Sequence, residues 1–274
     1  MFDYYQEKKR EEVIRKRRKK KFILASIVFF LFLGFLFFLF HSSFFQIKAL
    51  EVEEKDNHQQ IAEKNLISEV FREELNNLSW PLNWIFSKDN LVPVLFKKEV
   101  IIEKVFQSFP LFREVDLKVN FFEKKVIFLV KERNKFALWC KKTKEECFWF
   151  DEEGIAFLEA PVVEGELIFK VIDYSEGEVR KGEKVLADKD YLKNLISGFD
   201  FLNKAGIPLR TLELKDLSLA EISTQKLSNF PQIRFSLRHS PFFALEAIEK
   251  IRNIFPRLEY IDLTVENKIF YKEI

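Results

Sequence analysis

The chain has 274 residues with 47% apolar and 32% charged side chains, enough apolar surface to form a core, which excludes a collagenous or wholly disordered protein. It contains only two Cys, too few for a disulfide-stapled mini-protein of this length. Its charge is uneven: residues 1–21 carry ten basic and four acidic side chains, whereas residues 42–274 carry 35 basic and 39 acidic ones, and this mildly acidic body argues against a nucleic-acid-binding protein.

An apolar segment separates these two parts. Phe22–Phe40 is nineteen residues long without a charge, and a helix of that length spans about 30 Å, the thickness of the hydrocarbon core of a bilayer. A cleaved signal peptide has a shorter apolar region followed by a small-x-small cleavage site, and His41–Phe45 is a poor site. We therefore expect a basic tail at residues 1–21 and an uncleaved transmembrane helix at residues 22–41.

The orientation follows from a basic run directly before the apolar segment. The run consists of Arg15, Lys16, Arg17, Arg18, Lys19, Lys20 and Lys21. By the positive-inside rule it puts the N-terminus in the cytoplasm and residues 42–274 outside the cell membrane. The run could also bind anionic head groups of membrane lipid. Its role in setting the topology is enough to explain its presence, and we prefer that interpretation.

Residues 42–133 are predicted to fold as β-α-α-β-β, because apolar residues alternate in the strands and recur four residues apart in the helices. The predicted elements are a strand at Phe45–Glu53, a helix at Ile61–Leu78, a loop at Asn77–Pro93, a second helix marked by Ile101, Val105 and Phe109, and strands at Val115–Phe121 and Lys125–Lys131 around a turn at Phe122–Lys124. The expected apolar stripes of the first helix are Ala62, Leu66, Val70 and Ile67, Phe71, Leu75.

Residues 134–274 are richer in strands and contain two predicted helices. The helices are Tyr191–Ala205, ended by Gly206, and a segment from Pro241 to Pro256. The strands are Phe136–Cys140, Cys147–Asp151, Ile155–Leu158, Glu166–Ile172, Thr211–Leu214, Ala220–Thr224, Ile233–Leu237, Tyr260–Val265 and Ile269–Tyr271. The fold class expected for the whole chain is α+β.

Enzyme signatures are nearly absent from the sequence. No H-E-x-x-H, G-x-S-x-G or G-x-G-x-x-G motif occurs, and no metal-spaced Cys/His cluster. Ser223–Lys226 matches S-x-x-K, the nucleophile motif of penicillin-binding enzymes, but it lies at the end of a predicted strand and has no K-T-G partner. We therefore expect no catalytic residue, no metal site and no cofactor.

Cys140 and Cys147 flank the turn of a predicted hairpin. Directly opposite positions on two antiparallel strands are within disulfide range, and conditions outside the membrane are oxidising. A structural disulfide is favoured, and two buried free thiols are the alternative.

Several short motifs along the chain match, in order, those of one known protein family. They are Phe45–Val52, similar to the opening strand of a POTRA module; Asn83–Phe86, similar to its N-x-F loop; Phe109–Val115, similar to x-P-x-V-x-x-A/V; Val130–Arg133 with Ala137 and Trp139, similar to V-x-E-R-x-P-x-A-x-W; Phe150–Ile155, similar to V-D-x-x-G-x; and Tyr260–Leu263, similar to Y-[IV]-D-L-R. With the basic tail and the single anchor, they resemble the FtsQ/DivIB family. Asn134 and Lys135 replace the usual Pro, and Thr264 replaces the terminal Arg.

The resemblance implies a POTRA-like domain at residues 42–133 and a C-terminal β domain at 134–274. It further implies a non-enzymatic divisome scaffold at the division septum, which binds FtsB-like and FtsL-like single-pass proteins and other divisome components and links them to septal peptidoglycan synthesis. The alternative is a single-pass assembly protein of a pilus or secretion machine, which can have the same order of parts.

The resemblance also implies a binding edge near the C-terminus, where the segment after Y-[IV]-D-L-R pairs with a small coiled-coil partner. The residues expected to contact that partner are Val265, Asn267, Phe270 and Tyr271. A C-terminal strand that only completes its own sheet is the other possibility. Because proline cannot donate to a ladder, Phe270→Pro is expected to abolish partner capture with little effect on the thermal melt.

Overall fold

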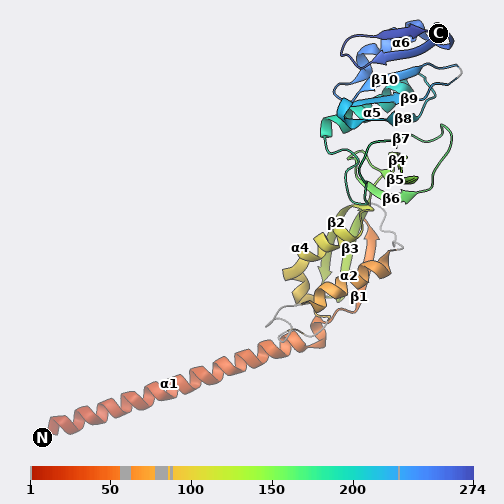
Figure 1. The fold of residues 1–274 in the computed structure, drawn as a ribbon. Helices are drawn as coiled ribbons and strands as arrows, with labels where there is room; N and C mark the ends of the chain where they lie inside the picture. Colours follow the sequence, from red (N-terminus) through yellow and green to blue (C-terminus); the bar gives the residue numbers. More distant parts are fainter. Residues whose placement is uncertain (1, 56–62, 78–85, 87–88, 228) are drawn as a thin grey trace. The chain divides into compact units, whose positions relative to one another are not determined.

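The computed structural model describes the chain apart from residues 1, 56–62, 78–85, 87–88 and 228 (Figure 1). It is a mixed α+β structure with an apolar N-terminal helix and a strand-rich C-terminal region that includes helices, which confirms the predicted class. The chain divides into two compact units. Met1–Phe106 and Val115–Lys131 form the first unit, and Gln107–Glu114 and Glu132–Ile274 form the second.

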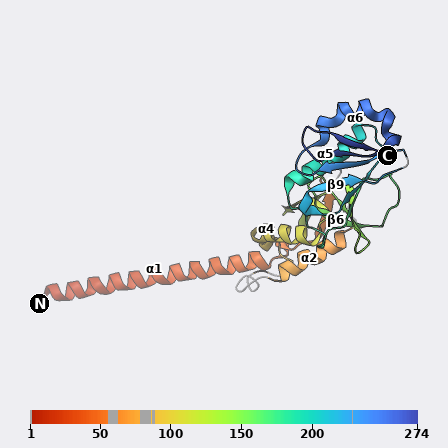
Figure 2. The ribbon, with the colours of Figure 1, turned by 45° about the horizontal axis from the view of Figure 1, so that its top comes forward.

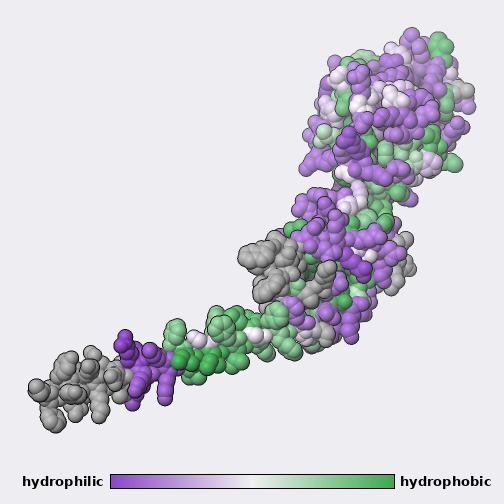
Figure 3. All heavy atoms as spheres, turned by 60° about the horizontal axis from the view of Figure 1, so that its bottom comes forward, coloured by the Kyte–Doolittle hydropathy of each residue, from purple (hydrophilic) through white to green (hydrophobic). Residues whose placement is uncertain are grey.

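The N-terminal helix α1 runs from Phe2 to His41 without a break. Its Arg15–Phe38 segment is long and apolar enough to cross a membrane, and its side chains are exposed (Figure 3). Residues 2–21 of the predicted basic tail are helical and continue directly into the apolar part of α1. The helix gives way to a 3₁₀ turn, η1 (Ser43–Phe45), in which the Ser42 hydroxyl accepts a hydrogen bond from the Phe44 amide at 3.2 Å.

Besides α1, the described residues of the first unit form a three-stranded sheet of order β1-β3-β2 and two further helices. Its elements are β1 (Ala49–Glu54), α2 (Lys64–Asn76), α4 (Leu91–Ser108), β2 (Phe112–Asn120) and β3 (Lys125–Glu132), and β1 runs parallel to β3. Helix α2 buries Ile67, Phe71 and Leu75, and the Phe71 ring lies edge-on to Phe128 of β3 with 5.7 Å between centroids. This contact joins helix and sheet in one apolar core.

Several boundaries in the first unit differ from those predicted. The first strand begins at Ala49, because Phe45 belongs to η1. Helix α4 begins well before Ile101, since the Asn90 side chain accepts a hydrogen bond from the Val92 amide at 2.9 Å and caps it, while Pro93 is tolerated in the first turn. Of the first predicted stripe of α2 (Ala62, Leu66 and Val70), Leu66 is exposed. Ala62 and most of the Asn83–Phe86 motif lie outside the described residues.

The second unit contains a nine-stranded sheet of order β12-β11-β10-β9-β8-β7-β4-β5-β6. Its strands are β4 (Ala137–Lys141), β5 (Glu146–Phe150), β6 (Ala156–Ala160), β7 (Lys170–Asp173), β8 (Thr211–Leu214), β9 (Glu221–Thr224), β10 (Gln232–Ser236), β11 (Leu258–Leu263) and β12 (Phe270–Glu273). The sheet is mixed, with parallel pairing of β4 with β7, β7 with β8 and β10 with β11. The helices are α5 (Lys189–Lys204) and α6 (Leu245–Ile251), and α6 is flanked by the 3₁₀ turns η3 (Pro241–Ala244) and η4 (Arg252–Arg257).

Helices α5 and α6 pack with the strands in one continuous core (Figure 2). Helix α5 starts where the Asp188 carboxylate accepts hydrogen bonds from the amides of Asp190 and Tyr191. The predicted strand Glu166–Ile172 is shorter than expected and begins at Lys170. The Glu166 carboxylate instead accepts hydrogen bonds from the Arg210 amide and the Thr211 hydroxyl, so the start of that segment is held by its side chain.

Candidate partner-binding edge

Strand β12 is the outermost strand of the nine-stranded sheet and lies at the C-terminus of the chain (Figure 1). It pairs with β11 on one side, and no described strand lies on its other side. All four of its residues are exposed. An edge of this kind presents unpaired amides and carbonyls that can accept a further strand.

The structure brings the four predicted contact residues together at this edge. Val265 is 45% exposed in the turn before the strand, and Phe270 and Tyr271 are each 51% exposed on it. Tyr271 lies opposite the buried Ile261, so it shares the core-facing side of the sheet, whereas Phe270 lies on the other side. The predicted set therefore occupies both faces of the sheet edge.

The backbone amides of β12 point alternately toward β11 and away from it. One hydrogen bond shows which of them point toward β11. The Ile274 amide donates to the Arg257 carbonyl at 2.9 Å, on the β11 side. Since successive amides of a strand point to opposite sides, the amide of Phe270 also points to β11, whereas that of Tyr271 points outward. Phe270→Pro was expected to remove a donor to the partner. It would instead remove a donor of the hydrogen bonds between β12 and β11, so the reasoning behind that expectation is wrong.

The turn between β11 and β12 is built by local polar contacts. The Asp262 carboxylate accepts hydrogen bonds from the Thr264 amide at 2.9 Å and from the Thr264 hydroxyl at 2.6 Å. The Lys268 amide donates to the Val265 carbonyl at 3.1 Å, and Asn267 adopts the left-handed conformation with φ of 58°. Asn tolerates this conformation better than most residues do. These contacts end β11 and return the chain as an antiparallel edge strand.

One ion pair crosses this edge. The Lys272 ammonium lies 2.7 Å from the Glu259 carboxylate, which raises the pKa of Lys272 and lowers that of Glu259 through their hydrogen bond. Both side chains are about half exposed, so the pair contributes little to stability. Its two charges compensate each other, and the rest of the strand consists of Phe270, Tyr271 and the acidic Glu273.

The opposite edge of the sheet, β6, is partly covered by its own chain. The Ala156 amide donates to the Glu183 carbonyl at 2.9 Å, and the Gly182 amide donates to the Ala156 carbonyl at 2.7 Å. Lys181 forms an ion pair with Glu159 further along β6. The β12 edge is therefore the more open of the two.

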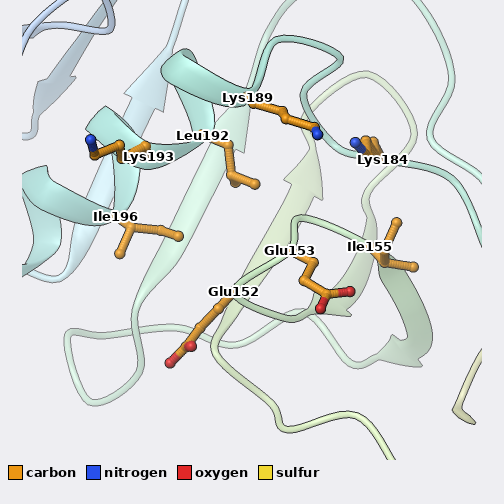
Figure 4. Close-up of a pocket in the computed structure, with 8 residues that line it drawn as sticks. All are labelled: Glu152, Glu153, Ile155, Lys184, Lys189, Leu192, Lys193 and Ile196. Carbon is orange, nitrogen blue, oxygen red and sulfur yellow. The ribbon is translucent and has the colours of Figure 1, made fainter. Parts of the chain in front are cut away.

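A cleft of about 590 Å³ lies beside helix α5 (Figure 4). It is lined by Glu152, Glu153, Ile155, Lys184, Lys189, Leu192, Lys193 and Ile196. No sequence pattern predicted this cleft, because the residues that line it come from a turn, a loop and a helix that are distant in the chain. It combines carboxylates, ammonium groups and an apolar floor, but no hydroxyl or thiol nucleophile and no imidazole.

The turn beside this cleft is held by residues of the family-like motifs. Arg133 and Asp151 form an ion pair at 2.6 Å, with side chains 5% and 6% exposed. Asp151 also accepts hydrogen bonds from the amides of Glu153 and Ile155. Gly154 has φ of 77°, and the side chain of a larger residue there would meet Leu192. In this chain, the residues that match the motifs V-x-E-R and V-D-x-x-G therefore stabilise the turn after β5.

A second guanidinium reinforces the same turn. Arg113 lies 2.6 Å from the Glu153 carboxylate, and this hydrogen bond holds the pKa of Glu153 below its usual range. The lowered pKa means that the contact stabilises the fold at neutral pH and is lost as the pH falls through that pKa. Because both side chains are nearly half exposed, we expect the effect to be small.

The remaining sequence candidates lie apart from β12. Cys140 and Cys147 face each other across the β4–β5 hairpin and are joined by a disulfide. Ser223 is in strand β9, where its hydroxyl accepts a hydrogen bond from Gln232 at 3.3 Å, so Lys226 is not one helical turn away from it. No group of His, Cys, Asp or Glu that could hold a metal occurs among the described residues.

The basic run Arg15–Lys21 lies on the exposed surface of α1, directly before the apolar part of that helix (Figure 3). Comparison with known proteins adds no assignment to these observations. No protein-family model matches the chain. No curated protein matches it either.

Proposed function

We propose that the protein is a membrane-anchored, non-enzymatic scaffold of the bacterial division machinery that captures other single-pass division proteins at the free edge of β12. The observation that carries this proposal is the open edge strand at the end of a nine-stranded sheet, on which Phe270 and Tyr271 are exposed. Strand addition at such an edge gives affinity through main-chain hydrogen bonds and specificity through alternate side chains.

The N-terminal helix supports the membrane part of the proposal. Helix α1 has the length and apolar composition of a membrane span, and the basic run Arg15–Lys21 precedes it. With the N-terminus in the cytoplasm, both folded units lie outside the cell membrane. The protein is then positioned to meet the extracytoplasmic segments of other single-pass proteins.

The first unit supports the comparison with the division family. After α1 and η1, its described elements follow the order β-α-α-β-β that the resemblance implies for a POTRA module. We take this unit as the POTRA-like domain and the second as the β domain of an FtsQ/DivIB-like protein. The partners expected from this assignment are FtsB-like and FtsL-like proteins, together with other components that act in septal peptidoglycan synthesis.

The geometry of β12 defines what its partner must look like. A partner strand lying beside Tyr271 would place its side chains alternately beside Phe270 on one face and beside Tyr271 on the other. A short segment with alternating apolar residues satisfies both faces. Long range charge attraction is not required, because Lys272 is already paired with Glu259.

A fluorescent fusion to the cytoplasmic N-terminus, imaged in dividing cells, tests the proposal. A ring at midcell that is present only during constriction, and filamentous growth after depletion, are the expected results. Polar or dispersed foci would contradict the division assignment and favour a pilus or secretion machine.

The non-enzymatic part of the proposal has its own test. Ser223→Ala is expected to support division as well as the unaltered protein, because Ser223 lies on a strand and contacts Gln232 rather than Lys226. Loss of division with the fold intact, or labelling of Ser223 by a β-lactam, would contradict the scaffold assignment.

A further inference from the structure

The turn between β2 and β3 presents an apolar ring to the surroundings. Phe122 is 96% exposed, more than any other large apolar side chain among the described residues. A single exposed apolar residue is common on protein surfaces and has no meaning by itself. The position of this residue relative to the anchor is what distinguishes it.

The turn holds Phe122 in place before any contact is made. The Asn120 side chain accepts hydrogen bonds from the amides of Phe122 and Glu123, both at 3.1 Å. Lys124 adopts the left-handed conformation with φ of 58°, and its carbonyl accepts a hydrogen bond from the Lys48 amide at 2.8 Å. Because the turn is already ordered, little conformational entropy is lost if the ring inserts into another medium.

The same turn contacts the segment that leaves the anchor. The Phe121 ring lies edge-on to Phe45 with 6.3 Å between centroids, and Phe45 lies edge-on to Phe44 at 5.1 Å. The Lys124 ammonium is 5.4 Å from the centre of the Phe44 ring. Three aromatic side chains and a cation therefore gather within the first unit, next to the end of the apolar helix, and Phe122 follows Phe121 in the chain.

Chain length places this cluster close to the bilayer. Phe45 follows Phe40, the last residue of the apolar segment, by five positions, so the two cannot lie more than about 18 Å apart even if the chain were fully extended. The helix continues to His41 and a 3₁₀ turn follows, both of which shorten this distance. The polar layer on each side of a bilayer is about 5–8 Å thick, so Phe45 lies within that layer or no more than about 10–13 Å beyond it.

We infer that the β2–β3 turn is a second membrane contact, in which the Phe122 ring inserts into the interfacial layer of the bilayer next to the anchor. Aromatic rings favour this layer, and Lys124 keeps its ammonium at the phosphates while its stem covers apolar surface. The contact limits rotation of the first unit about the end of α1. The inference rests on the membrane anchor in the proposed function, but it is independent of any role in division.

The ligand of this surface is lipid rather than a protein partner, because the anchor already brings the turn to the bilayer. A protein partner would have to compete with lipid for a small surface that is centred on the Phe122 ring. The short chain segment between Phe40 and Phe45 keeps this surface near the bilayer. A test in pure lipid, without any other protein, separates these two occupants.

The experiment uses the full chain carrying Phe122→Cys, labelled with the fluorophore NBD and reconstituted into phosphatidylcholine–phosphatidylglycerol vesicles. Cys140 and Cys147 are joined in a disulfide, so the introduced thiol is the reactive one. The matched control is Lys104→Cys, on an exposed position of α4. Asn90, just before α4, is paired with Gln46 near the anchor, and position 104 lies about 20 Å further along the helix axis.

NBD at position 122 is expected to emit at shorter wavelength than at position 104. Lipids with a doxyl group high on the acyl chain should quench it at least about twofold more strongly than they quench the control, since interfacial side chains lie about 5–10 Å deep. Equal emission and equal quenching at the two positions would overturn the inference. Release of the protein from the vesicles by alkaline carbonate would instead refute the anchor, and the proposed membrane contact with it.

Discussion

Replacing Tyr271 with proline removes an outward amide of β12 without changing the ladder to β11. Tyr271→Ala is the matched control, because it removes the same ring but keeps the amide. Both variants lose the buried half of the tyrosine, so their free energies of unfolding should agree within about 1 kcal/mol. Any difference in partner binding between them then reports on the main chain alone.

The size of each effect follows from the exposure of Tyr271. A tyrosine can bury about 150–250 Å², and its 51% exposed part leaves roughly 100 Å² for a partner to cover, worth about 2 kcal/mol of binding energy. Tyr271→Ala should therefore weaken binding about 30-fold. One net hydrogen bond contributes about 0.5–1.5 kcal/mol, so Tyr271→Pro should weaken binding by a further factor of about 2–12.

The assay is binding of the proposed partner, an FtsB-like protein from the same cells, to the full chain in lipid nanodiscs, with a thermal melt of each variant. Phe270→Pro serves as a contrast, because the Phe270 amide points to β11 and its loss should lower the free energy of unfolding by about 1–3 kcal/mol. Equal affinity of Tyr271→Pro and Tyr271→Ala, with both folded, would refute strand addition at β12.

Three further predictions concern residues that stabilise the second unit. Arg133→Ala should lower the free energy of unfolding by about 3–5 kcal/mol in urea titrations, because it leaves the Asp151 carboxylate buried without its ion pair; a change below 1 kcal/mol would mean that water reaches the site. Gly154→Ala should cost at least about 1–2 kcal/mol in the same titration, since its backbone is left-handed, and a neutral result would show that the turn can rearrange. Replacing Cys140 and Cys147 with Ser should cost about 2.5 kcal/mol, given their separation of 7 residues, and leave partner affinity unchanged; a loss of affinity in the folded variant would connect the hairpin to binding.

Much of the local structure could be predicted because it depends on neighbouring residues. A dense apolar run predicted β3 to within a residue of its observed end, and the spacing of Ile67, Phe71 and Leu75 identified the buried stripe of α2. Helix α4 was predicted to start too late, because the Asn90 cap lies outside the apolar periodicity that was used to find the helix. Glu166 shows the opposite case, in which a side-chain contact with Arg210 and Thr211 shortens a predicted strand.

The candidate edge was found only in part. The four residues Val265, Asn267, Phe270 and Tyr271 were selected from a family resemblance, and the structure brings them to one exposed edge. Which of their amides point outward depends on the register with β11, and a sequence pattern with a period of two residues does not contain that information. The choice between Phe270 and Tyr271 as the site of a proline test therefore required the pairing of the strands.

By itself, the sequence determined the features that arise from hydropathy, charge and short-range hydrogen bonding: an apolar helix after a basic run, the alternation of the strands, and the turns between them. Only the tertiary structure decided which strand is outermost, that β6 is covered by Gly182–Glu183 while β12 is open, and that Arg133 and Asp151 meet in the core. The physical reason is the separation along the chain of the residues that interact. Periodicity records which face of one element is buried, whereas strand order and buried ion pairs depend on the packing of elements that are far apart in the chain.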